Sequence, residues 1–148
     1  MFVIGMPGET RKEIYETVMF AQNNPSIDYS VFSIATPMVG TRLANKVKLG
    51  TSNNQTDNLN KIIKRTVLLY ETTEFSPLEI GLIRGYDWKK INFSTEERKL
   101  KYSKMVGVTV TELDQLIEHS IKTFQTFFPD YEGPKSFIDL FEQGKIIS

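Results

Sequence analysis

The sequence of 148 residues contains no cysteine. Disulfides, thiolate zinc sites, cysteine nucleophiles and iron–sulfur clusters ligated by the chain itself are therefore excluded. There is a single histidine, His119, which lies beside Glu118 in a stretch predicted to be helical. Because no candidate nucleophile can be placed near it, we expect a surface or interface histidine and not a catalytic base.

The chain also lacks an excess of charge of either sign, with 18 basic and 18 acidic residues. This balance predicts neither a nucleic acid nor a membrane surface as a partner. No apolar run approaches the ~20 residues that span a bilayer, and the first residues lack the features of a signal peptide. We expect a soluble, cytoplasmic protein.

The first segment reads as a strand, a turn and a helix. Residues 2–5 are all apolar or glycine, and residues 6–9 fit a tight turn, with proline fixing φ and Gly8 free to adopt positive φ. Thr10 and Glu13 form the capping box of a helix predicted over 11–23. The buried face of that helix would carry Ile14, Val18 and Ala21.

A second strand is predicted over residues 29–34, which makes a parallel, right-handed strand–helix–strand unit. The ends of the two strands, at Gly5 and at Ala35-Thr36, would then share the carboxyl edge of the sheet, where ligands bind. An apolar interior strand needs neighbours on both edges, yet only one other convincing strand follows. We therefore expect a piece of a larger α/β enzyme.

After Gly40 the sequence predicts a linker and helices. The linker is expected over residues 49–57. Ser76-Pro77 and Ser94-Thr95 are helix-start signals, and Gly107 is a helix-stop signal. Helices are predicted over 43–47 and 59–72, from 76, over 94–107, over 110–128 and over 136–142.

The loop over residues 5–10 is the leading candidate for ligand contact. Its glycines let a ligand approach the backbone, and the helix start offers unpaired N–H groups. It matches neither a P-loop nor a Rossmann fingerprint, and an ordinary strand-to-helix turn is the simpler interpretation. The segment over residues 35–41 lies at the matching edge and carries little weight alone.

Polar and aromatic side chains also gather around Gly85. Such a cluster can close over a substrate, but Trp88 is more typical of a core anchor, with Arg84 as its ion-paired neighbour. The acidic residues at 96–97 and 112–114 lie in first helical turns and are expected to cap them. The cluster consists of Glu79, Arg84, Tyr86, Asp87 and Trp88.

Two linked motifs resemble a known family. Residues 2–10, a helix of about fifteen residues, and residues 29–37 followed by Gly40-Thr41 are similar to the late barrel of radical S-adenosylmethionine (SAM) enzymes. The similarity is greatest to the branch in which a cobalamin-binding domain precedes the radical domain. It covers about the first forty residues, and Val39 departs from the pattern, which usually has a second proline there.

This resemblance implies an α/β fold: a partial (β/α), or TIM-like, barrel followed by a mostly α-helical C-terminal extension. Residues 1–48 would hold the last two parallel strands and their intervening helix, and residues 58–148 the extension. In the family, backbone near the strand ends holds the adenosyl group, and the matching positions include Gly8 and Glu9. Glu9 is interpreted mainly as a residue that orders the helix start and the loop. The implied cofactor-binding positions are Ile4, Gly5, Gly8, Glu9, Ala35 and Thr36.

The family's Cys-x-x-x-Cys-x-x-Cys loop, which binds a 4Fe–4S cluster, is absent, and so is a cobalamin domain. The resemblance therefore implies SAM, the iron–sulfur cluster and possibly cobalamin in an intact methyltransferase-like parent, with none bound by this chain alone and no metal site. We expect its partners to be the missing N-terminal part of the enzyme, or other copies through exposed strand edges.

Two alternatives remain open. One is a small non-catalytic helical interaction module whose 110–128 stripe faces a partner. The other is a helix-turn-helix DNA binder in residues 58–106, which the neutral charge disfavours.

Overall fold

The computed structural model describes residues 1–37, 40–46 and 73–144. The predicted linker over 49–57 and the predicted helix over 59–72 lie outside these ranges. The elements are β1 (Phe2–Ile4), α1 (Arg11–Asn23), β2 (Phe32–Ile34), α2 (Arg42–Lys46), α4 (Pro77–Leu82), the π-helical turn η1 (Ile83–Asp87), α5 (Trp88–Asn92), α6 (Glu96–Val106), α7 (Val110–Phe127) and α8 (Phe137–Glu142).

The N-terminal unit is β1–α1–β2, and its strands are parallel, with Phe2 opposite Phe32 and Ile4 opposite Ile34. Helix α1 has the predicted bounds, because the Thr10–Glu13 capping box starts it and Asn24 leaves helical geometry at φ −90° and ψ 107°. Its buried residues are Ile14, Val18 and Ala21, as predicted.

Both strands are shorter than predicted. β1 ends at Ile4 because Gly5 turns away with φ 81°. β2 begins at Phe32, not at Tyr29, because its partner β1 begins at Phe2, which lies opposite Phe32, so residues 29–30 extend past the start of β1. In the described part of the chain the sheet has two strands.

Helices α4 and α5 are joined by η1 into one continuous helical segment. The predicted start is confirmed: Ser76 caps the helix, Glu79 completes the capping box and Pro77 occupies the first turn. The π turn was not predicted. It contains Gly85, whose missing side chain lets α7 approach, since a Cβ there would lie 3.1 Å from Phe124 Cβ.

The later helix boundaries follow their sequence signals. Thr95 and Thr109 accept hydrogen bonds from the first turns of α6 and α7, and Gly107 ends α6 with φ 75°. The apolar stripe of α7 packs inside its own fold, where Leu113, Ile117 and Phe124 are buried. This burial removes the argument for a partner-facing stripe.

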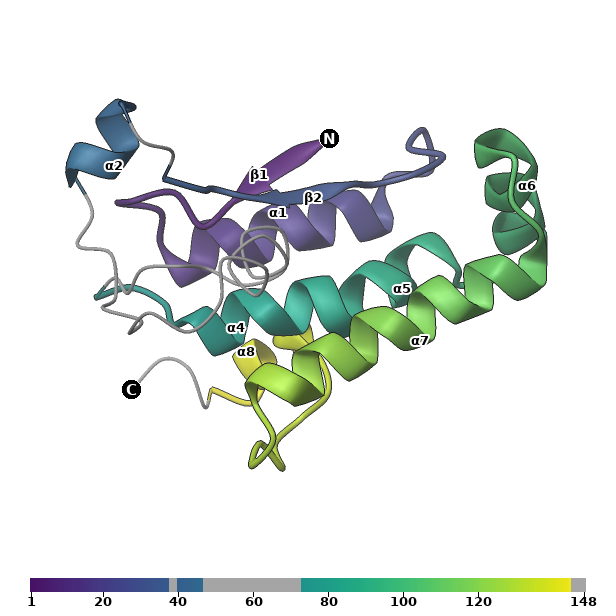
Figure 1. Cartoon of the computed structure of the whole chain (residues 1–148). Coiled ribbons are helices and arrows are strands. Elements are labelled where there is room, and N and C mark those ends of the chain that lie inside the picture. Colours follow the sequence, from purple (N-terminus) through teal and green to yellow (C-terminus); the bar gives the residue numbers. More distant parts are fainter. Residues whose placement is uncertain (38–39, 47–72, 145–148) are drawn as a thin grey trace.

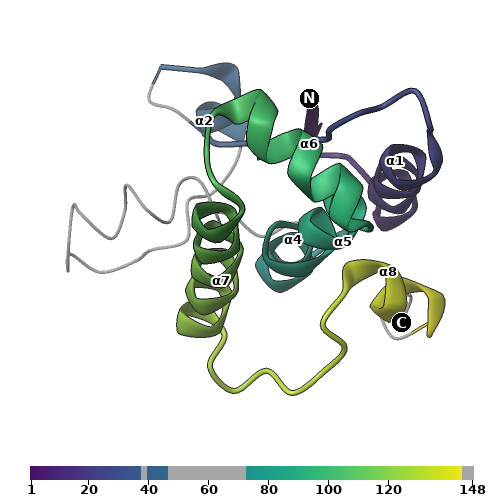
Figure 2. The same cartoon turned by 90° about the vertical axis from the view of Figure 1, so that its right-hand side faces the viewer.

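Figure 1 shows β1 and β2 at the top of the molecule, α4, α5, α7 and α8 beneath them, and α6 at one end, at the height of the strands. Figure 2 shows α6 above α7. One core joins the two parts, since Ile4, Phe32 and Ile83 belong to the same buried cluster. No helix within residues 1–37, 40–46 or 73–144 combines the length and apolarity needed to cross a membrane.

Candidate ligand site at the strand ends

The carboxyl ends of β1 and β2 lie side by side. The Ala35 N–H donates to the Ile4 carbonyl over 2.9 Å, which holds the ends of the two strands together. The residues singled out from the sequence therefore share one edge, as a parallel sheet requires. We call this edge the strand-end site; it comprises Ile4, Gly5, Gly8, Glu9, Ala35 and Thr36.

Glu9 holds the loop of the strand-end site in place. Its Oε2 accepts hydrogen bonds from the Gly5 N–H at 2.7 Å and the Met6 N–H at 3.1 Å. Its own N–H donates to the Met6 carbonyl over 3.0 Å, closing the predicted turn. These contacts confirm the loop-ordering role inferred for Glu9. Burial raises the pKa of its carboxyl group, and the two backbone hydrogen bonds oppose that rise.

Two glycines of this loop adopt backbone conformations that other residues rarely tolerate. Gly5 has φ 81° and Gly8 has φ 88°. Around Gly8 there is open space where a side chain would begin. The backbone of the loop can thus be approached closely by a ligand at this point.

The start of α1 offers fewer free donors than the sequence suggested. The Thr10 N–H donates to Glu13 Oε2 over 2.7 Å, and the Glu13 N–H donates to Thr10 Oγ1 over 3.2 Å. The expectation of unpaired N–H groups is therefore wrong for these two amides. Since Glu9 and Glu13 both place carboxylates here, the site suits a ligand rich in amino and hydroxyl donors better than a phosphate.

Thr36 directs its side chain back to the sheet. Its hydroxyl donates to the Ile34 carbonyl over 3.1 Å, on the edge of β2 that faces away from β1. Ala35 is buried. At this position the Ala35 N–H and the Thr36 hydroxyl hydrogen both bond within the chain.

The polar residues around Gly85 form links between segments. Glu79 accepts from Arg11 Nε at 2.8 Å, which ties α4 to α1. Asp87 is fully buried and accepts from the Ser136 hydroxyl and the Phe137 N–H, which ties η1 to α8. Arg84 has no acidic partner among the residues that the structure describes; its Nη1 donates to the Phe32 carbonyl at 2.9 Å.

The remaining members of this cluster serve the core and its border. Trp88, predicted to be a core anchor, is partly buried: it packs against the core cluster and edge-on against Phe93, with ring centroids 5.3 Å apart. His119 is exposed, as expected. The residues of the described ranges hold no group of three histidine or acidic side chains that suits a metal ion.

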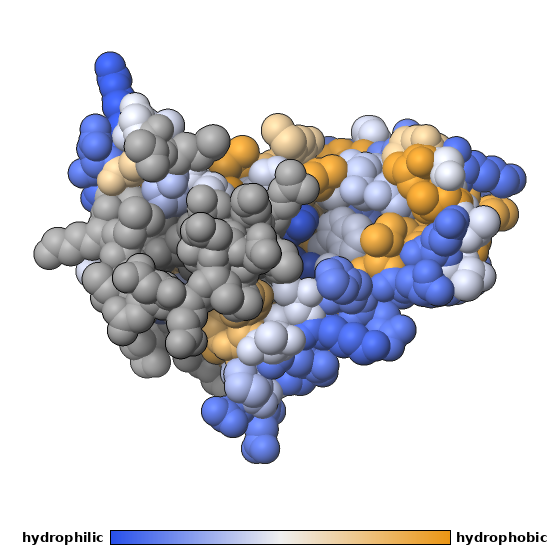
Figure 3. Space-filling model, viewed as in Figure 1, coloured by the Kyte–Doolittle hydropathy of each residue, from blue (hydrophilic) through white to orange (hydrophobic). Residues whose placement is uncertain are grey.

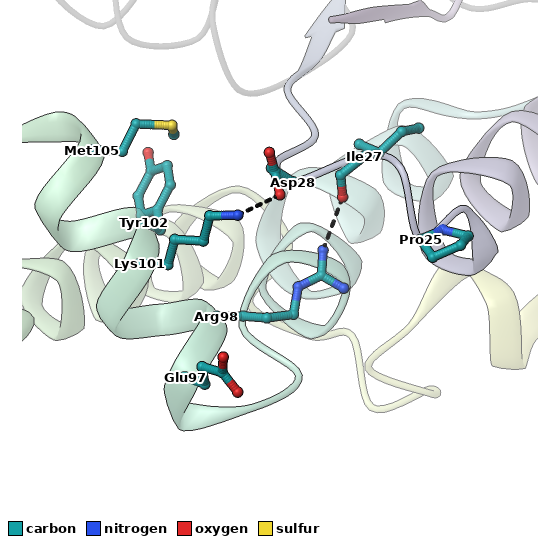
Figure 4. Close-up of a pocket in the computed structure, with 8 residues that line it drawn as sticks. All are labelled: Pro25, Ile27, Asp28, Glu97, Arg98, Lys101, Tyr102 and Met105. Carbon is teal, nitrogen blue, oxygen red and sulfur yellow. Dashed lines mark hydrogen bonds and ion pairs between the residues drawn. The ribbon is translucent and has the colours of Figure 1, made fainter.

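A hollow of about 340 Å³ that the sequence did not indicate lies between α6 and the residues preceding β2 (Figure 4). Lys101 Nζ bonds to Asp28 over 2.6 Å, and Arg98 Nη2 donates to the Ile27 carbonyl over 3.4 Å. The hollow lies at the amino end of β2, opposite the strand-end site. Its basic groups already have partners within the chain.

The chain is similar over part of its length to a known protein. It is 55% identical over 42 residues to an uncharacterized methyltransferase of Pyrococcus horikoshii. The match covers 28% of this chain and 9% of that methyltransferase, so the chain spans a small share of its relative. No family model matches the chain, and no solved structure matches it significantly. Over that segment the chain is methyltransferase-like.

Proposed function

We propose that this chain supplies the last two barrel strands and the helical cover of a SAM-dependent methyltransferase of the radical SAM type, in the cobalamin-associated branch. In this proposal the strand-end site is part of the SAM-binding edge, the helices from α4 onward cover the barrel, and the chain is inactive alone. The observation that carries the proposal is the parallel β1–α1–β2 unit, in which the Ala35 N–H donates to the Ile4 carbonyl and holds the carboxyl ends of the two strands side by side.

The strand-end site fits the adenosyl part of SAM. An adenosyl group presents amino and hydroxyl donors, and the half-buried carboxylate of Glu9 is an acceptor at the site. The glycine at position 8 leaves room for a ligand beside the loop. SAM itself supplies a methyl group and a cleavable sulfonium. The role of this chain would be to bind and orient the adenosyl end.

The residues do not fit an iron–sulfur cluster. The sequence has no cysteine, and clusters of this type are held by cysteine thiolates. The cluster of the proposed parent would have to be held by another part of the enzyme. We therefore expect the isolated chain to take up no iron during anaerobic reconstitution, and stoichiometric cluster absorbance would contradict this expectation.

The proposal is tested by SAM binding in a reconstituted complex. The chain is co-expressed with the P. horikoshii methyltransferase from which the 42 matching residues have been deleted, and binding of radiolabelled SAM is measured by equilibrium dialysis. We expect the complex to bind SAM, and Glu9→Ala to weaken the binding by at least tenfold, because the N–H groups of Gly5 and Met6 lose their acceptor.

The matched control is Glu16→Ala, which removes an exposed acid of α1 whose only described contact is a surface ion pair with Lys12 at 3.7 Å. This variant should bind SAM as the wild type does. Equal SAM binding by Glu9→Ala and the wild type, or a complex that binds no SAM, would contradict the proposed function.

A further inference from the structure

The two outer edges of the small sheet differ. We propose that the rest of the enzyme docks at the outer edge of β1, by adding a parallel strand beside Val3 and a helix over Phe20, and that the outer edge of β2 is the finished end of the sheet. The identity of this partner rests on the proposed function above; the choice of edge rests on the hydrogen bonds and exposures described next.

Side chains of the C-terminal part close the outer edge of β2. In the parallel register, residues 30, 32 and 34 direct their backbone groups away from β1. Asn92 Oδ1 accepts from the Ser30 N–H at 2.7 Å, and Asn92 Nδ2 donates to the Ser30 carbonyl at 2.9 Å. The Asn92 amide thus pairs with Ser30 much as a neighbouring strand would.

The next two carbonyls along this edge are also occupied. Arg84 Nη1 donates to the Phe32 carbonyl at 2.9 Å, and the Thr36 hydroxyl donates to the Ile34 carbonyl at 3.1 Å. Asn92 and Ser30 are both buried beneath the helical cover. A further strand cannot pair here without displacing α4 to α5.

Among residues 1–37, 40–46 and 73–144, no comparable side-chain bonds close the outer edge of β1. Phe2 and Ile4 direct their backbone groups to β2, since the Phe2 N–H donates to Val31 and the Ile4 carbonyl accepts from Ala35. Val3 therefore directs its N–H and carbonyl outward, and within the described ranges no strand pairs with that side. Natural sheet edges are usually protected by lysine, proline or a bulge, but residues 1–6 contain none of these.

Exposed apolar side chains flank this open edge. Val3 is 48% exposed on the face of the sheet away from Ile4, and Met1 is 85% exposed at the start of the strand. On the other face, Phe20 of α1 is 55% exposed although its ring packs edge-on against Phe2 at 6.2 Å. Figure 3 shows apolar surface along the upper rim, where the strands lie. A strand at β1 with its own crossover helix would bury both groups of side chains.

The length of the relative supports this occupant over a second copy of the chain. The matching 42 residues are 9% of the P. horikoshii methyltransferase, so most of that protein lies outside the match and can provide further strands. Parallel sheets are built from successive strand–helix units with both faces covered, and two such strands alone are not a complete sheet. A parallel strand–helix unit therefore fits the β1 edge in two ways: its strand can bond to the outward backbone groups of Val3, and its helix can cover the exposed side chain of Phe20.

The test uses a proline that removes only the outward donor. In Val3→Pro the lost N–H faces away from β2, so the β1–β2 ladder keeps its hydrogen bonds, while a strand added at β1 loses a ladder partner and meets the proline ring. Val3→Thr keeps the N–H and the β-branched shape and is the matched control. Thermal unfolding and circular dichroism of both variants check that the chain itself still folds.

Each variant is co-purified with the P. horikoshii methyltransferase lacking the 42 matching residues. We expect the wild type and Val3→Thr to form the complex, and Val3→Pro, while still folded, to lose at least tenfold in affinity. Undiminished binding by Val3→Pro, no complex with the wild-type chain, or homodimers that need Val3 in place of the complex would each overturn the inference. A Val3-dependent complex that binds no SAM would instead contradict the proposed function and leave the docking edge standing.

Discussion

The carboxylate of Asp87 is fully buried and joins two segments that are far apart in the sequence. Its oxygens accept from the Ser136 hydroxyl at 2.6 Å and from the Phe137 N–H at 2.7 Å. Burial raises the pKa of this group, and the hydrogen bonds and the nearby Lys90 lower it by less. The hydrogen bonds that hold the start of α8 therefore depend on the ionisation state of Asp87.

The stability of the protein should depend on pH through Asp87. The pKa of Asp87 in the folded chain lies above the ordinary value of 3.8. At a pH between 3.8 and this raised pKa, the folded chain therefore holds more protons than the unfolded chain. The stabilisation from this group is complete below pH 3.8 and is lost as the pH rises through the folded pKa. The asparagine in Asp87→Asn does not titrate, so its contribution to the free energy of unfolding does not change with pH.

The measurement is the free energy of urea unfolding for the wild type and for Asp87→Asn at several pH values. We expect the wild-type value minus the variant value to fall as the pH rises from 3.8, by about 1.4 kcal/mol for each unit by which the folded pKa is raised. A difference that increases with pH would show that the hydrogen bonds outweigh burial at this carboxyl.

At the scale of elements, the continuous segment α4–η1–α5 depends on two glycines that face α7. A Cβ at Gly85 would lie 3.1 Å from Phe124 Cβ, which the backbone of α7 holds in place. A Cβ at Gly81 would lie 3.1 Å from Phe128 Cε2, the outer end of a ring at the end of α7. The distances are equal, but only the second neighbour can move aside by rotating its side chain.

Gly85→Ala and Gly81→Ala should therefore differ in sign. We expect Gly85→Ala to lower the free energy of unfolding by roughly 1–3 kcal/mol, because α7 must shift. Gly81→Ala should leave it unchanged or raise it by up to about 1 kcal/mol, since alanine favours a helix. Chemical unfolding of the two variants under the same conditions measures both values. Equal losses would contradict the distinction between a fixed and a movable neighbour.

The helix starts were predictable because each depends on residues within one turn. Thr10 with Glu13 and Ser76 with Glu79 form the expected capping boxes. Of the two possible starts of the longest helix, Thr109 and Thr111, it is Thr109 that caps the helix, in a box with Glu112. The π turn at η1 and the short extent of β2 were not predictable in this way. Each depends on residues far apart in the sequence: Phe124 packs against Gly85, 39 residues away, and β2 pairs only along the short β1, whose Phe2 lies opposite Phe32.

The strand-end site shows the same division. Its glycines, its turn and the role of Glu9 follow from local sequence, and the structure places them together. The partners of Arg84 and Asp87 were missed because they belong to β2 and to the start of α8, which no local pattern connects to residues 84 and 87. The polar residues around Gly85, considered as a possible cover over a substrate, instead form hydrogen bonds between separate segments of the chain.

At the scale of the whole molecule, Asn92 decides how many open edges the sheet has. Asn92→Leu removes both hydrogen bonds to Ser30 while keeping a side chain of similar size. Two buried backbone groups would lose their partners, which should lower the free energy of unfolding by about 2–4 kcal/mol. The variant would also leave β2 with an edge that other chains can pair with, in addition to the edge of β1.

We therefore expect Asn92→Leu to self-associate more than the wild type, as measured by analytical ultracentrifugation across a range of concentrations, and to melt at a lower temperature. The matched control is Asn23→Leu, which adds the same side chain at an exposed position at the end of α1 and should change neither property greatly. A destabilised Asn92→Leu that stays in the oligomeric state of the wild type would mean that α4 to α5 still shields β2 without the amide. In that case the packing of the helices would prevent other strands from pairing with β2, and the hydrogen bonds of Asn92 to Ser30 would contribute only to stability.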